Sequence, residues 1–256
     1  MEESYKKNTK LVVLLFSSVV FLSSCLLFII QPIFAKYILS WFGGTSSVWI
    51  VCLVFYQGVL ALGYIYAYLI TRCFSIRIQL VFHSILLSMC LFLQQDALTY
   101  VSRELLVDVI WLKVLNVLVF SIGLPFFILS SSSPLLQSWM GLGSKFKNIY
   151  RMYAISNLGS LLALILYPFF IEPYSSRTYQ YKLWLNLFYL YVFLFLLVNF
   201  IIFGWVRKGS MFFMEKVSKN ISFKDFFLWL SLSALSVSLL VSTTTVISKQ
   251  ILPLPL

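Results

Sequence analysis

The residues best suited to chemistry in this chain lie in one stretch, residues 31–49, QPIFAKYILSWFGGTSSVW. It holds an amide, Gln31, and a lone cation, Lys36, among apolar residues, and Pro32 lacks a backbone donor. A proline disfavours helix at the preceding residue and frees carbonyls that protein or water must satisfy. One interpretation is a broken or re-entrant helix lining a polar cavity, with Lys36 facing an anionic group. The other is an interfacial helix whose lysine extends to lipid headgroups.

Two more polar side chains interrupt apolar runs. Gln57 stands beside Gly58, and Asn157 falls within the run that follows Tyr150. A polar group inside such a run needs a partner and marks a candidate functional position. Gln31, Lys36, Gln57 and Asn157 therefore form the candidate set for a polar pathway or a ligand site.

Glycine and proline mark the expected turns and breaks. We expect Gly43 and Gly44 to make the turn into the second helix. Pro125 should kink the fourth helix, and Pro134 should close it. The serines at 130–133 can hydrogen-bond back to backbone carbonyls, or they can line a pathway.

The elements that position these residues are predicted to be membrane-spanning helices. The chain is 61% apolar and only 11% charged, whereas soluble domains average about 25% charged residues. Apolar stretches of about 20 residues, each long enough to cross a bilayer, recur along it. The fold class is therefore an all-α polytopic bundle of six or seven helices, forming one transmembrane domain over residues 1–256. The expected spans are 11–30, 47–70, 76–94, 109–133, 152–171, 183–206 and a seventh that begins near 226.

The charge distribution predicts an orientation and argues against nucleic-acid binding. The net charge is +11, but the cations lie in short clusters between apolar runs, as orientation signals do. With the N-terminus in the cytoplasm, the inside segments carry about twice as many Lys and Arg residues as the outside ones. We therefore expect a multi-pass protein of a bacterial inner membrane with a cytoplasmic N-terminus. The lipid bilayer is its expected partner, and nucleic acid is not.

Catalytic and metal-binding patterns are missing from the sequence. The four cysteines form no CxxC pair, and His83 is the single histidine, so neither a metal site nor a cofactor is expected. No carboxylate pair or Ser-His-Asp set is visible either. We interpret His83 as a helix-packing residue. The expected class is a protein that is not an enzyme.

Four segments carry a family resemblance: residues 31–49, 55–69 (FYQGVLALGYIYAYL), 123–139 (GLPFFILSSSSPLLQSW) and 150–173 (YRMYAISNLGSLLALILYPFFIEP). They resemble the membrane half of bacterial spermidine-synthase-like membrane proteins, a fused major-facilitator-like and spermidine synthase family. Together they cover roughly 75 residues and lie in the family's order. They place Pro, Gly, Trp and Asn where hydrophobicity alone would not require them.

The resemblance implies a membrane region that precedes a cytoplasmic, Rossmann-like domain similar to aminopropyltransferases. Residues 242–248 are similar to a motif in a middle helix of such proteins, and the catalytic domain has no counterpart in this sequence. No catalytic residue can therefore be assigned, and we expect a truncated or split form. Three hypotheses follow: a non-catalytic membrane part, a transporter or transporter half for polyamines or another small solute, and an anchor for a separate soluble enzyme. The protein partner would be a soluble synthase-like chain, contacting the basic residues at 207–224, or a second membrane chain.

Overall fold

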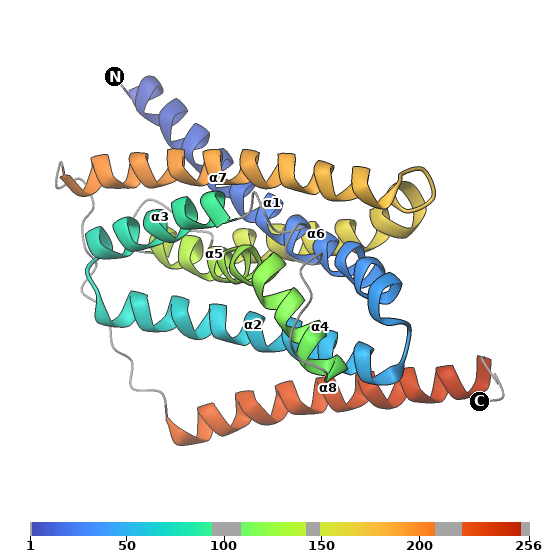
Figure 1. Ribbon diagram of the computed structural model, residues 1–256. Coiled ribbons are helices and arrows are strands. Elements are labelled where there is room, and N and C mark those ends of the chain that lie inside the picture. Colours follow the sequence, from blue (N-terminus) through green and yellow to red (C-terminus); the bar gives the residue numbers. More distant parts are fainter. Residues whose placement is uncertain (1, 94–108, 142–148, 208–221, 252–256) are drawn as a thin grey trace. The chain divides into compact units, whose positions relative to one another are not determined.

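Every regular element in the described part of the chain is a helix. The computed structural model describes residues 2–93, 109–141, 149–207 and 222–251 (Figure 1). The helices are α1 (Glu2–Phe42), α2 (Ser46–Cys73), α3 (Ile76–Leu93), α4 (Ile110–Leu118), η3 (Val119–Gly123), α5 (Leu124–Gly141), α6 (Ile149–Leu166), η4 (Tyr167–Ile171), α7 (Arg177–Arg207) and α8 (Phe223–Ile251). The prediction of an all-α protein is confirmed.

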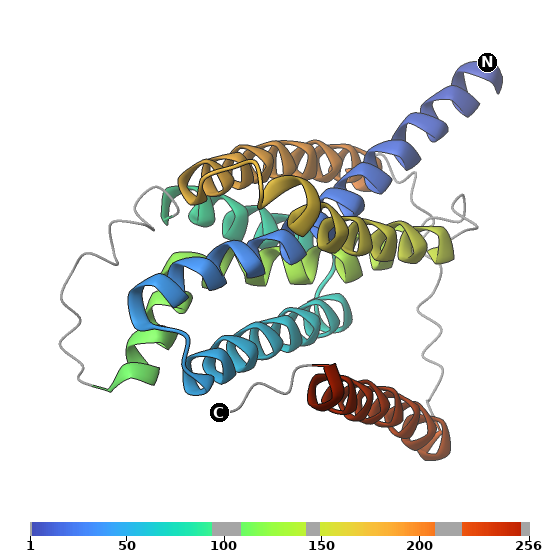
Figure 2. The ribbon, with the colours of Figure 1, turned by 90° about the vertical axis from the view of Figure 1, so that its right-hand side faces the viewer.

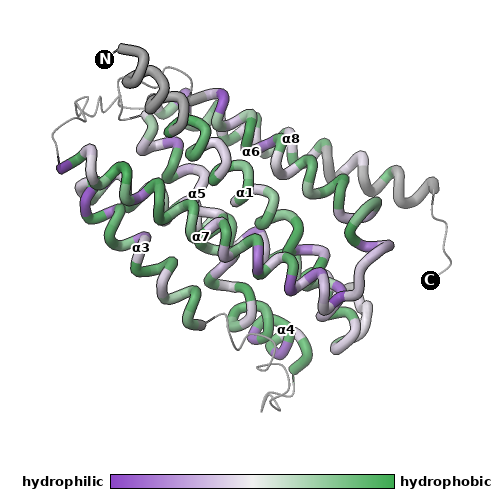
Figure 3. The backbone as a smooth tube through the Cα atoms, turned by 90° about the horizontal axis from the view of Figure 1, so that it is seen from above, coloured by the Kyte–Doolittle hydropathy of each residue, from purple (hydrophilic) through white to green (hydrophobic). Residues whose placement is uncertain are grey.

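Five helical segments among the described residues are long and apolar enough to cross a membrane. They are Val12–Phe42, Ser47–Cys73, Ile110–Gly141, Tyr150–Ile171 and Arg177–Arg207. A shorter apolar helix covers Ile76–Phe92. Hydrophobic residues occupy most of the length of these helices (Figure 3), and many large apolar side chains, such as Phe92 and Phe200, face outward. Such outward apolar surface is expected where lipid rather than water surrounds a helical bundle.

Helices α1 and α5 form the centre of the packing. Helix α1 contacts α5, α6 and α7, and α5 also contacts α2, α3 and α6. Figures 1 and 2 show α1 running obliquely past α6 and α7. Helix α6 is more peripheral, since most of its side chains are exposed. The core is consequently built from apolar side chains of α1, α5 and α7, including Phe34, Phe126 and Trp184.

Two short π-helical turns accompany two prolines. The turn η3 ends just before Pro125, and η4 contains Pro168 near its start. Pro125 cannot donate to the carbonyl of Ser121, so the ladder widens into a π turn there. The helix axis changes direction between α4 and α5 (Figure 1). The predicted kink at Pro125 is therefore confirmed.

Two other predicted breaks are wrong. Helix α1 continues through Pro32 to Phe42, and α5 continues through Pro134 to Gly141. The reason is tertiary packing, which outweighs the lost backbone hydrogen bond. After Pro32, the side chains of residues such as Phe34 and Ile38 are fully buried, and after Pro134 the same holds for Trp139.

The turn between α1 and α2 lies where glycine predicts it. Gly43 has φ of +81°, and its N–H donates to the Leu39 carbonyl at 3.0 Å. A left-handed residue of this kind ends many helices and suits glycine, which has no Cβ. Gly44 follows in the turn before α2 begins at Ser46, so the prediction for both glycines is confirmed.

The chain divides into two compact units, residues 1–213 and 214–256. The first contains α1 to α7. In the second, the side chains of α8 from Phe223 to Leu239 are exposed. The serines of α8, such as Ser231 and Ser238, donate to carbonyls one turn back, which satisfies their hydroxyls within the helix.

Candidate functional site

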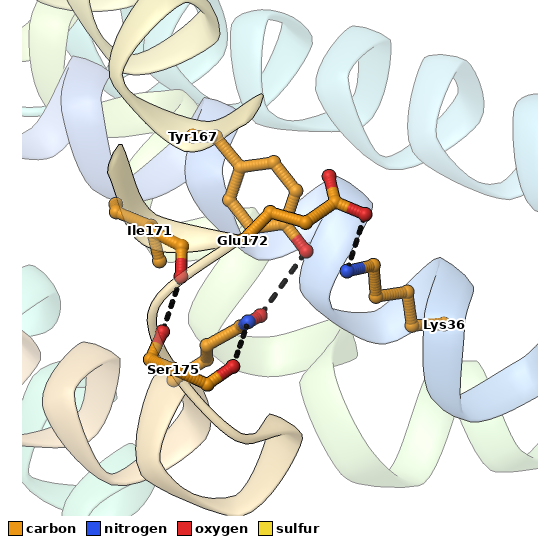
Figure 4. Close-up of polar contacts among 6 residues, drawn as sticks. Lys36, Tyr167, Ile171, Glu172 and Ser175 are labelled. Carbon is orange, nitrogen blue, oxygen red and sulfur yellow. Dashed lines mark hydrogen bonds and ion pairs between the residues drawn. The ribbon is translucent and has the colours of Figure 1, made fainter. Parts of the chain in front are cut away.

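A polar cluster joins the last part of α1 to the connection between α6 and α7. Lys36 Nζ lies 2.6 Å from Glu172 Oε1, and the two side chains are 30% and 42% exposed. The same ammonium lies 5.5 Å from the centre of the Tyr167 ring. The continuation of α1 past Pro32 carries Lys36 to this place, and η4 turns the chain so that Glu172 faces it (Figure 4). The anionic group that the first interpretation placed opposite Lys36 is thus a side chain of the same protein, Glu172.

Gln180 organises the buried side of this cluster. Its Oε1 accepts a hydrogen bond from the Tyr167 hydroxyl at 3.1 Å, and its Nε2 donates to the Ser175 carbonyl at 2.9 Å (Figure 4). Ser175 Oγ donates to the Ile171 carbonyl. Only 2% of Gln180 is exposed, so these bonds replace water for both ends of its amide.

The burial of Gln180 could have been predicted from its position in the sequence, although a polar residue is not usually assigned to the core. Gln180 begins a stripe of buried residues on α7 that continues through Trp184, Phe188, Tyr191 and Phe195. The spacing of three and four residues is that of one helix face. A glutamine at the head of such a stripe occupies a core position and requires hydrogen-bond partners there.

Aromatic side chains surround the cluster on the α1 side. The Arg177 guanidinium lies 5.9 Å from the Tyr37 ring centre, and Tyr37 packs on Trp41 with ring centres 5.3 Å apart. Tyr37 also meets Tyr181 edge-on at 6.4 Å. Tyrosine and tryptophan near cations are typical of the membrane–water interface.

The four segments that carry the family resemblance contact one another in a closed ring. The Tyr56 hydroxyl donates to the Gln31 carbonyl at 3.4 Å, which joins residues 55–69 to 31–49. Gly63 packs so closely on Ser130 that an added Cβ would collide with it, which joins 55–69 to 123–139.

The remaining two contacts close this ring. Ser133 Oγ lies 3.3 Å from Ser156 Oγ, joining 123–139 to 150–173. The Lys36–Glu172 ion pair joins 150–173 back to 31–49. Each segment therefore touches two of the others, and we call this arrangement the four-segment ring.

The four candidate polar residues do not meet in one cavity. Gln31 is half-buried, and its Nε2 donates to the Leu27 carbonyl one turn back at 3.3 Å. Gln57 on α2 and Asn157 on α6 are exposed side chains of two different helices. Lys36, the charged member of the set, pairs with Glu172. The helix of Gln31 and Lys36 is unbroken, so the broken or re-entrant helix of the first interpretation is not what the chain forms at Pro32.

The serine run on α5 is buried and bonded to its own helix. The Ser130 hydroxyl donates to the Phe127 carbonyl at 2.8 Å, and Ser131 and Ser132 donate to the Ile128 carbonyl at 3.0 and 2.6 Å. The expected bonding back to carbonyls is confirmed. Ser132 also contacts the Tyr191 hydroxyl of α7, so the run joins helices as well.

A second polar cluster lies where α3 meets α5 and α7. The Trp139 Nε1 donates to Gln79 Oε1 at 2.7 Å, and His83 Nδ1 lies 3.3 Å from the Tyr66 hydroxyl. His83 is fully buried, with its ring centre 4.8 Å from that of Phe195, as its interpretation as a packing residue implies. Within the described residues, His83 Nε2 and Asn199 Oδ1 are the buried side-chain atoms without a hydrogen-bond partner.

Neither cluster assembles metal-ligating side chains. Among the residues that the structure describes, no three His, Cys, Asp or Glu side chains gather as a metal site would require. Comparison with known proteins finds no matching protein-family model, no matching curated protein and no matching solved structure.

Proposed function

We propose that this chain is a non-catalytic membrane scaffold, the membrane-embedded N-terminal part of a spermidine-synthase-like protein of the bacterial inner membrane. The observation that carries the proposal is the four-segment ring. Residues of the segments that carry the family resemblance, among them Lys36, Glu172 and Gly63, make contacts that join helices to one another.

The kind of contact in the ring favours a scaffold over a catalytic site. Three of its four links are hydroxyl contacts or the close packing of a glycine, which are the usual means of joining membrane helices. A catalytic constellation would instead bring titratable groups together around an open cavity. The partly exposed Lys36–Glu172 pair is the part of the ring that a second membrane chain could reach.

Transport remains the second hypothesis, and the geometry favours it less. Discontinuous helices commonly form the substrate sites of transporters, but α1 passes Pro32 without interruption. The proposed anchoring of a soluble enzyme by the basic residues at 207–224 concerns a segment that lies almost entirely outside the described residues.

Two assays on the purified full-length chain test the proposal. In detergent, the chain is expected to transfer no aminopropyl group to putrescine from decarboxylated S-adenosylmethionine. In proteoliposomes, it is expected to raise putrescine and spermidine uptake no further than protein-free liposomes do. Aminopropyl transfer contradicts the non-catalytic assignment, and uptake that Lys36→Met abolishes supports the transporter hypothesis instead.

The genomic sequence beyond the codon for Leu256 tests the family assignment separately. We expect a reading frame there that encodes further apolar helices and then a strand, a glycine-rich loop and a helix. Unrelated sequence in all three frames contradicts the assignment to a synthase-like protein.

A further inference from the structure

One side of α2 is turned away from the helices on which α2 packs. Helix α2 contacts mainly α4 and α5, and Gly63, which packs on α5, lies on its inner side. Opposite Gly63, the exposed residues recur every three or four positions, which is the spacing of one helix face. We call these residues, Val54, Gly58, Ala61 and Ile65, the outer face of α2.

Gln57 places an amide beside this outer face, and its side chain is exposed. Along the helix it lies about 15 Å from Ser47 and about 24 Å from Cys73, the two ends of the apolar segment. The hydrocarbon core of a bilayer is about 30 Å thick. A span of this length therefore puts the Gln57 amide deep in the core, far from either headgroup level.

The amide of Gln57 makes no hydrogen bond with another described residue. Gln31 differs, because its amide donates to a carbonyl one turn back in its own helix. Lipid tails offer neither donors nor acceptors, and polar side chains of membrane helices almost always face protein or a water-filled cavity. We therefore expect protein to cover Gln57 in the bilayer.

A second copy of the chain has the chemistry to cover this amide. An amide holds both donors and an acceptor, so two of them can satisfy each other reciprocally. Two copies with the same topology pair about a two-fold axis along the membrane normal, and residues at equal depth then meet. Gln57 of one copy would consequently face the partner's Gln57.

The surroundings of Gln57 permit such an approach. Gly58 and Ala61 lie beside it, and a Cβ added to Gly58 would meet nothing within 4 Å in this chain. Small residues let two membrane helices pack closely. Between Trp49 and Arg72 the sequence of α2 has no charged residue, so self-association brings no like charges together inside the hydrocarbon.

We propose that the chain forms a two-fold symmetric dimer in the membrane through the outer face of α2, in which the two Gln57 side chains hydrogen-bond to each other. The dimer does not depend on the proposed scaffold function, and either can fail without the other.

Disulfide cross-linking of the full-length chain in liposomes locates the interface. Single cysteines are introduced into a variant whose native cysteines are alanine. Oxidation of Gly58→Cys and Ala61→Cys should give a covalent dimer, because both positions lie beside the two-fold axis. Leu161→Cys, at an exposed position of α6, should stay monomeric. Equal dimer yields from all three positions would mean random collision and would overturn the proposal.

Gln57→Leu tests the hydrogen bond. Förster transfer between chains labelled at the N-terminus, measured as the proteoliposomes are diluted with lipid, gives the association constant. Leucine has a similar size but neither donor nor acceptor, so association should weaken about tenfold. Asn157→Leu removes the exposed amide of α6. It is the matched control and should leave association unchanged.

Three outcomes overturn the proposal. They are unchanged association of Gln57→Leu, an equal loss in Asn157→Leu, and a wild-type chain that stays monomeric at every protein-to-lipid ratio. The last would mean that a different partner, or another segment of the same chain, covers the outer face of α2. Circular dichroism of each variant separates a loss of association from a loss of folding. If Gln57→Leu fails to fold, the cross-linking pattern of the cysteine variants decides alone.

Discussion

Lys36 Nζ and Glu172 Oε1 lie 2.6 Å apart although 136 positions separate them in the chain. The pair closes the four-segment ring by joining α1 to the start of the α6–α7 connection. A lysine that looks isolated in its own helix thus has its counter-ion in the connection between α6 and α7, and its ammonium lies near the Tyr167 ring. Its function in the structure is to hold the end of α1 in place.

Breaking this ion pair should destabilise the bundle modestly. We expect Lys36→Met to lower the free energy of unfolding by about 1 kcal/mol, because both charges are partly exposed and solvent screens them. In a cycle with Glu172→Gln, the coupling energy should be about 0.2–1 kcal/mol. Unfolding by denaturing detergent, followed by circular dichroism, measures each variant.

Lys182→Met is the matched control for this cycle. Lys182 lies near the same end of α7, and its side chain is exposed. Its replacement should change stability by less than Lys36→Met and should show no coupling to Glu172→Gln. Equal losses from the two lysine variants would contradict a specific ion pair.

Gln180 should be more sensitive than either charge. Gln180→Leu leaves the Tyr167 hydroxyl and the Ser175 carbonyl without their partner, and an unsatisfied buried polar group costs about 1–3 kcal/mol. Adding Tyr167→Phe removes one orphaned group, so the double variant should be less unstable than the sum of the single losses. Strict additivity in the same unfolding assay would argue against this hydrogen bond.

Two glycines should respond to alanine in opposite ways. A Cβ on Gly159 would lie 2.7 Å from the Phe21 carbonyl oxygen of α1, whereas one on Gly58 would meet nothing within 4 Å. We expect Gly159→Ala to cost about 1–3 kcal/mol through overpacking. Gly58→Ala should be neutral or stabilising by up to about 1 kcal/mol, because alanine favours the helix. Similar effects of both substitutions on unfolding would refute the close approach of α6 to α1.

The helical class and the approximate position of spans such as Ser47–Cys73 could be predicted, because the length of an apolar run is read directly from the order of the residues. The ends could not. The first span was expected to stop near residue 30, but α1 continues to Phe42. Local rules treat Pro32 as a stop, whereas burial of Phe34 and Ile38 against other helices outweighs its cost. The turn at Gly43 and the kink at Pro125 depend on backbone conformation at those residues, and both could be predicted from the local sequence.

The site was only half predictable for a related reason. One of the two interpretations of Lys36 placed an anionic group opposite it, but the sequence did not identify Glu172 as that group. Which residue of the α6–α7 connection meets α1 depends on how the helices pack. Helix packing cannot be deduced from a single sequence. The exposed positions of Gln57 and Asn157 also follow from packing, since an amide in an apolar run can face either side of its helix.

Pro32→Ala distinguishes a structural proline from a functional break. The proline denies the Phe28 carbonyl its usual donor in a helix that continues for ten residues beyond it. Alanine would restore that hydrogen bond and favours helix by up to about 3 kcal/mol relative to proline. We therefore expect the variant to unfold at the same or a higher denaturant concentration, with the Lys36–Glu172 coupling energy unchanged. A less stable variant, or one that loses this coupling, would mean that Pro32 sets the path of α1 toward Glu172, and the packing argument for its tolerance would be wrong.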